Sequence, residues 1–177
     1  MAGRKVRHVR AVVTAWDASH DDRGRVLLRP RGKWVAQVIT LDEYFGPWKD
    51  SPDATEERKQ NARLLLHACT ALQYFAERDG VEFPDNPHTG SGVSGQTYGG
   101  FRPQDCPQGA EHSSHKEGMA VDRYDPEGLI DKWCMNNAEV GGLLESCGIY
   151  IEHPDSTRGW SHWTTRRPGS GNRVFKP

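Results

Sequence analysis

One long amphipathic segment constrains the fold of this chain more than any other feature. Between residues 55 and 79, apolar side chains recur at helical spacing, which predicts a helix with one buried face. Thr55 stands at the N-cap position and Asp79-Gly80 follows the last apolar residue, so both helix ends are marked. The predicted buried stripe consists of Leu64, Leu65, Ala68, Leu72, Phe75 and Ala76. Such a helix is roughly 37 Å long, and other elements must pack along it.

Shorter helices and strands follow from local patterns. Thr40 precedes LDEYF and Glu43 occupies the capping-box position, which predicts a short helix. Residues 126–147 predict a helix or helix pair. Ile149 and Ile151 alternate with polar neighbours as in a strand, and after a turn at 153–159 the sequence WSHWTT predicts the last strand. We therefore expect an α+β fold in which a small antiparallel sheet packs against helices.

Length and charge favour one soluble domain. The chain has 177 residues, with 23 Lys+Arg against 24 Asp+Glu, so nothing draws it generally toward nucleic acid or an anionic membrane. We divide it into a basic extension, 1–39, which can belong to the same domain, and a main domain, 40–177. In the extension, two short strands are expected around the polar turn at 21–24.

The sequence shows no apolar run of the ~18–20 residues that a membrane span needs. The basic start is followed by only three apolar residues, at 11–13, against the ~7–15 of a signal-peptide core. Four scattered cysteines without a CxxC pair favour free thiols. We expect a cytoplasmic monomer with neither an integral membrane segment nor a nucleic-acid partner.

The segment 84–112 differs in character from the rest of the chain. It is rich in Gly, Pro, Ser and Asn and has no periodicity. A structureless stretch of this length within a compact domain is usually functional or disordered. The sequence that follows it, SSHKEGMAVDRYDP at 113–126, contains side chains that bind metals and therefore favours a functional role.

His115 and Asp122 are the first two candidate metal ligands. They would lie about 10 Å apart on a helix and over about 20 Å apart on one strand. Two ligands of one zinc ion lie only ~3–3.5 Å apart, so the chain must reverse between them, and Gly118 permits the turn. His162 is the best third ligand because its predicted strand could pair with residues 120–124. His112 could instead be an outer contact of the site or touch substrate.

Two imidazoles, one carboxylate and an open fourth position are typical of catalytic zinc. The string Ser113-x-His115-x-x-Gly118-x-Ala120-x-Asp122 resembles the signature of the M15 family of D-Ala-D-Ala peptidases. WSH at 160–162 is similar to the element that supplies that family's third zinc ligand. The similarity covers roughly 40–177 and extends to peptidases of bacteriophages that act as endolysins.

The resemblance implies a Hedgehog/DD-peptidase fold, one Zn²⁺ per chain held by His115, Asp122 and His162, and a peptidoglycan stem peptide as substrate. It implies a carboxypeptidase or an endopeptidase, in the second case a phage lysis enzyme that reaches the wall after release. GGFRPQDCPQGA resembles the family's substrate-binding segment, and its arginine maps onto Arg102. Ser113 could hold a ligand or substrate, or cap a turn.

This chain departs from the family pattern at the general base. Many members carry Glu or Asp three residues before the last histidine, where this sequence has Gly159. We expect Glu152 to serve instead, since it ends a strand and can face His162 across a hairpin; Asp155 is the alternative. The missing carboxylate also motivates a second hypothesis, an inactive zinc-binding module of phage structure or wall binding. A third hypothesis assigns the basic ends to a nucleic-acid or wall-polymer contact.

Overall fold

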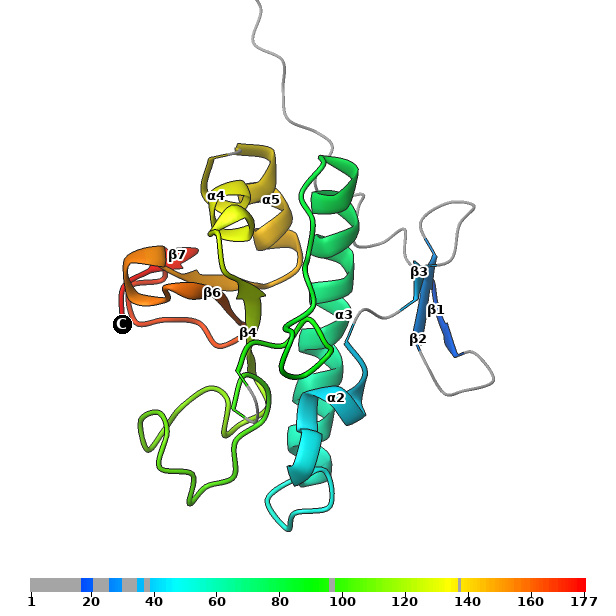
Figure 1. The fold of residues 1–177 in the computed structure, drawn as a ribbon, viewed down its shortest axis with the longest axis vertical. Coiled ribbons are helices and arrows are strands. Elements are labelled where there is room, and N and C mark those ends of the chain that lie inside the picture. Colours follow the sequence, from blue (N-terminus) through cyan, green and yellow to red (C-terminus); the bar gives the residue numbers. More distant parts are fainter. Residues whose placement is uncertain (1–16, 21–25, 30–34, 37–38, 96–97, 137) are drawn as a thin grey trace, which may run out of the picture.

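The structure is a computed structural model that describes residues 17–20, 26–29, 35–36, 39–95, 98–136 and 138–177. Its main body is α+β, as expected. In Figure 1, the long helix α3 (Glu56–Arg78) stands between a four-stranded sheet and a separate three-stranded sheet. The three-stranded sheet consists of β1 (Asp17–His20), β2 (Val26–Arg29) and β3 (Val35–Ala36). Its first two strands confirm the expected hairpin around 21–24; the other features predicted for 1–39 fall mostly outside the described residues.

The predicted helices are confirmed, including their caps. Thr55 caps α3 by accepting a hydrogen bond from the Arg58 amide, and Asp79 ends it. The helix α2 (Leu41–Phe45) begins with the predicted capping box of Thr40 and Glu43, and the 3₁₀ helix η1 (Gly46–Trp48) follows. The predicted helix pair is α4 (Leu129–Asn136) and α5 (Ala138–Ser146).

The four-stranded sheet is mixed, which corrects the expectation of a purely antiparallel sheet. Its order is β4-β6-β5-β7, with β4 (Ala120–Asp125), β5 (Tyr150–Glu152), β6 (Gly159–Thr164) and β7 (Val174–Phe175). β6 pairs antiparallel with both β4 and β5, whereas β7 pairs parallel with β5. The strand β6 is therefore not the last one. A second 3₁₀ helix, η2 (Pro154–Ser156), lies in the β5–β6 turn.

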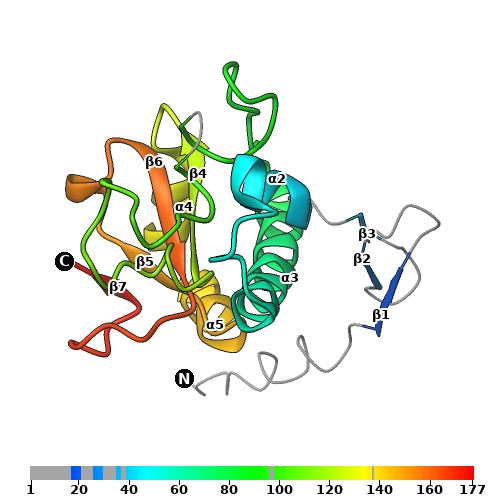
Figure 2. The same ribbon diagram turned by 90° about the horizontal axis from the view of Figure 1, so that it is seen from below.

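The two faces of this sheet have different environments. Val121, Ile151 and Trp163 are fully buried in the core with residues of α3, α4 and α5. In Figure 2, α3 lies to the right of β4 and β6. Because side chains alternate along a strand, Asp122 and His162 project from the opposite face. The hydrophobic core therefore packs against one face of the sheet, and the candidate metal ligands lie on the other face.

The buried stripe of α3 differs from the predicted one at Leu64. Its buried residues include Leu65, Leu66, Cys69 and Leu72, whereas Leu64 is 57% exposed. Leu64, Leu65 and Leu66 are consecutive and span most of the helix circumference, so one of them must face outward. No helix in the described ranges combines the length and apolar character needed to cross a membrane.

Adjacent leucines of α3 offer a matched test of this packing. Leu65→Ala should lower the free energy of unfolding by about 2–5 kcal/mol, because it removes a fully buried side chain. Leu64→Ala should change it by no more than about 0.5 kcal/mol. Urea unfolding followed by circular dichroism measures both. Equal losses in the two variants would contradict this assignment of the buried face.

Candidate metal centre

A tight turn brings the first candidate ligand back toward the sheet. Gly118 has φ +72°, and its amide donates to the His115 carbonyl at 3.2 Å. A Cβ atom at Gly118 would lie 2.4 Å from the Arg58 carbonyl oxygen, so glycine is needed here both for its conformation and for space. The chain then enters β4, which carries Asp122. The reversal predicted between His115 and Asp122 is confirmed.

The second and third ligands meet by strand pairing. Asp122 of β4 lies directly opposite His162 of β6. His162 Nδ1 is 2.7 Å from Asp122 Oδ1, and His115 Nε2 is 3.3 Å from each of these two atoms. The structure thus brings together the three residues selected from the sequence, and this largely buried group could hold a metal ion.

The spacing of the three donor atoms is close to that of a four-coordinate zinc site. Tetrahedral ligands at ~2.0–2.1 Å from zinc lie about 3.3 Å from one another. Two of the three separations match this spacing and the third, 2.7 Å, is shorter. Two imidazole nitrogens and one carboxylate oxygen also form the ligand set of an open catalytic site. The residues therefore fit a zinc ion.

A backbone carbonyl orients His115. Its Nδ1 lies 2.7 Å from the Gly100 oxygen, so Nδ1–H donates there and Nε2 presents its lone pair to the site. Burial lowers the pKa of His115, although Asp122 acts in the opposite direction, and the neutral form is the one that binds metals. Gly100 also lies close to α2, because a Cβ atom at Gly100 would be 2.1 Å from the backbone carbonyl oxygen of Tyr44.

Asp122 is held by its backbone and by both carboxylate oxygens. Its amide donates to the Gly99 oxygen at 2.7 Å. Oδ1 faces the two histidines, while Oδ2 accepts a 2.9 Å hydrogen bond from Arg102. Burial alone would raise the pKa of Asp122, but its contacts with His115 and His162 outweigh burial and hold that pKa below its usual range. The carboxylate is therefore ionised.

The three ligands open onto a cavity of about 460 Å³. Glu152 lines it, and the β5–β6 pairing sets this residue one position beyond Ile151, which lies opposite Trp163. Partial burial raises the pKa of Glu152; His162 lowers it and Asp122 raises it further. Among the described lining residues, Glu152 has the one side-chain carboxylate besides Asp122.

The other predicted residues are placed differently. Ser113 lines the cavity, but its hydroxyl also accepts a hydrogen bond from the His115 amide at 3.4 Å, as in a turn cap. His112 lines the cavity from an exposed position. Asp155 is not among the lining residues: it is exposed and bonds Lys176 at 2.9 Å, and this hydrogen bond lowers its pKa.

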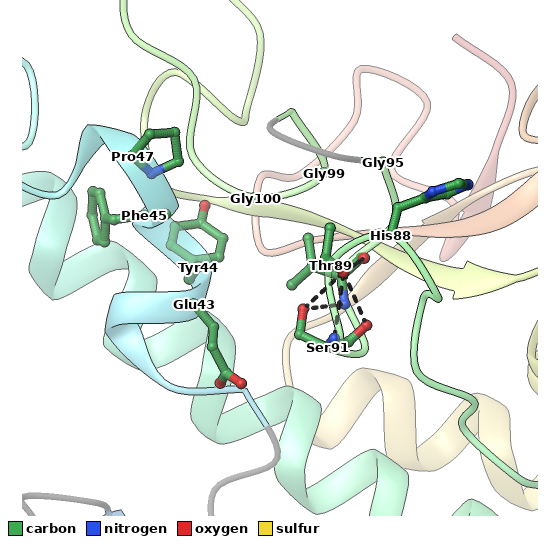
Figure 3. Close-up of a pocket in the computed structure, with 12 residues that line it drawn as sticks. Glu43, Tyr44, Phe45, Pro47, His88, Thr89, Ser91, Gly95, Gly99 and Gly100 are labelled. Carbon is green, nitrogen blue, oxygen red and sulfur yellow. Dashed lines mark hydrogen bonds between the residues drawn. The ribbon is translucent and has the colours of Figure 1, made fainter.

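A second cavity, of about 240 Å³, lies beside Gly99 and Gly100 (Figure 3). Tyr44, Phe45 and Pro47 line one side, and Thr89 and Ser91 hydrogen-bond one another on the other side. Its wall includes Gly99 and Gly100, whose carbonyls hold the ligand residues, but none of the three ligands lines it.

Sequence reasoning missed two parts of this site. The Gly99 and Gly100 carbonyls are backbone groups, which no residue pattern reveals; the adjacent glycines in segment 84–112 were the one available sign. Phe175 also lines the cavity from β7, and that strand has two residues, too few for a periodic signal.

Comparisons of this chain with protein-family models, with curated proteins and with solved structures find no match.

Two glycines with similar positive φ angles, Gly118 at +72° and Gly128 at +67°, allow a test of the turn. Gly118→Ala and Gly128→Ala both place alanine at positive φ, at a cost of roughly 1–2 kcal/mol each. Only Gly118→Ala also forces a Cβ atom against the Arg58 carbonyl, which should add about 1–3 kcal/mol. Thermal unfolding of the metal-free variants measures the difference. A Gly128→Ala variant as unstable as Gly118→Ala would refute the close approach at the turn.

Proposed function

We propose that this protein is a zinc-dependent peptidase that hydrolyses an amide bond of the peptidoglycan stem peptide. The observation that carries the proposal is the convergence of His115, Asp122 and His162 at the floor of an open cavity. A carboxylate, Glu152, lines the same cavity. A closed structural zinc site would use a fourth protein ligand instead, and would not need a cavity or a base.

The ligand chemistry supports zinc and hydrolysis together. A zinc ion bound here would acidify a water molecule and polarise the scissile carbonyl. His115 contributes Nε2 because its Nδ1–H is committed to Gly100, and Asp122 contributes Oδ1 because Oδ2 is committed to Arg102. Each ligand therefore presents one atom in a fixed direction. Two histidines and a carboxylate also hold iron(II) in oxygenases, so metal identity is part of the test below.

Glu152 is the proposed general base. Its carboxylate would accept a proton from the attacking water and deliver it to the leaving amine. Burial raises the pKa of Glu152, which brings its affinity for a proton closer to what this shuttle needs near neutral pH. Asp155 is a poor candidate because it is exposed and paired with Lys176.

The substrate class rests on the sequence resemblance to M15 peptidases, together with the Hedgehog/DD-peptidase fold that the resemblance implies. The mixed sheet with helices on one face and ligands on the other is compatible with that fold. Trp160 and Phe175 line the cavity and would pack against a bound peptide, with Ser113 available for a hydrogen bond. A phage lysis enzyme that reaches the wall after release fits this function.

The first test compares wild type with His162→Ala. Wild type should bind one zinc ion per chain and release new amino groups from purified peptidoglycan. His162→Ala should lose both, because one of three ligands is removed. Elemental analysis identifies the metal and an amine-reactive dye measures cleavage. Absence of zinc in wild type, or iron in its place, would refute the proposal.

The second test separates a peptidase from an inactive zinc-binding module. Glu152→Gln should keep zinc but lower the cleavage rate by about 10²–10⁴-fold, because the proton acceptor is gone. Asp155→Asn is the matched control and should leave the rate unchanged, since this side chain points to Lys176. Zinc without cleavage in wild type would favour the inactive module. Full activity of Glu152→Gln would mean that another group serves as the general base.

A further inference from the structure

The Arg102 side chain forms hydrogen bonds within the protein, and one of them is to the candidate metal ligand Asp122. Its Nη2 donates to Asp122 Oδ2 at 2.9 Å, and its Nε donates to the Tyr98 carbonyl at 2.6 Å. The Arg102 and Asp122 side chains are only 13% and 10% exposed. Two of the three guanidinium nitrogens are thus committed inside the protein, which leaves Arg102 poorly placed as a two-pronged clamp on a substrate carboxylate.

We propose that Arg102 is a positioning residue that makes Asp122 a one-oxygen metal ligand. This inference rests on the proposed function, because it concerns how the same centre binds zinc. With Oδ2 held by the guanidinium, only Oδ1 faces the two histidine nitrogens. A carboxylate that bound through both oxygens would occupy a further coordination position. Arg102 therefore keeps that position available for water and substrate.

The Tyr98 carbonyl explains why an arginine is needed. It fixes Nε, so the planar guanidinium can present Nη2 to Asp122 in one direction only. A lysine would retain the positive charge, but one ammonium cannot reproduce the planar fork that reaches both acceptors. The backbone amide of Arg102 also donates to the His115 carbonyl at 3.4 Å, and a side-chain substitution leaves that donor in place. Side-chain variants therefore remove the contacts with Asp122 and Tyr98 but keep this backbone contact.

The sign of the effect on zinc affinity distinguishes this role from simple electrostatics. A positive charge beside the site repels a cation, so its removal should strengthen zinc binding if charge alone mattered. If Arg102 positions Asp122, zinc binding should weaken in both Arg102→Lys, which keeps the charge, and Arg102→Gln, which removes it. Loss of such supporting contacts typically costs about 10–100-fold in metal affinity.

The experiment measures zinc affinity by competition with a chromophoric chelator in wild type, Arg102→Lys, Arg102→Gln and Arg166→Gln. Arg166 is the matched control, because its guanidinium bonds the His112 carbonyl near the same cavity but touches no ligand. Both Arg102 variants should bind zinc about 10–100-fold more weakly, and Arg166→Gln should match wild type. In cobalt(II)-substituted protein, the visible absorption of both Arg102 variants should weaken as Asp122 turns to bind through both oxygens.

Several outcomes would overturn the proposal. Unchanged zinc affinity and cobalt spectrum with a raised KM would make Arg102 a substrate contact. Tighter zinc binding in Arg102→Gln with an unchanged cobalt spectrum would make its role purely electrostatic. If neither Arg102 variant showed a cooperative thermal transition when metal-free, its role would be general to folding. Failure of wild type to bind zinc or cleave peptidoglycan would instead overturn the proposed function, which keeps the two failures distinct.

Discussion

The pairing of β4 with β6 is the constraint on which the candidate metal centre depends. Asp122 and His162 are distant in sequence and meet because they are direct cross-strand partners. A slip of one residue would turn Asp122 into the core and Val121 into the cavity. Val121, which is fully buried, makes that slip costly because its side chain would leave the core. Hydrophobic packing on one face thus specifies ligand geometry on the other.

The aperiodic segment before the ligands completes this geometry through backbone contacts. Buried Asn86 organises it: its Nδ2 donates to the Val93 and Gly95 carbonyls, each at 3.3 Å. The segment then runs beside β4, where the Ser94 amide donates to the Asp122 carbonyl at 2.7 Å. A loop held in this way can position functional side chains. The Gly99 and Gly100 carbonyls belong to this support.

Local sequence patterns predicted the helices and the candidate ligands. Contacts between segments distant in sequence determine the features that were not predicted. Capping by Thr40 and Thr55 involves neighbours three residues away, so a short sequence window contains the whole interaction. The three candidate ligands were selected from the spacing of His115 and Asp122 and from the resemblance to a family signature. The parallel pairing of β7, the outward orientation of Leu64 and the contact of Arg102 with Asp122 all depend on segments distant in sequence. No local pattern encodes such contacts.

The charges at the centre support the proposed hydrolysis rather than tight structural binding. As metal ligands, two imidazoles and one carboxylate supply a single negative charge, and Asp122 shares that charge with Arg102. A divalent cation held by these groups would therefore keep a net positive charge, in contrast to a cation surrounded by thiolates. That residual charge is what polarises a carbonyl and acidifies water. The same arrangement limits affinity, so the fixed directions of His115 Nε2 and Asp122 Oδ1 must compensate through pre-organisation. The buried carbonyls and the Arg102 guanidinium provide that pre-organisation.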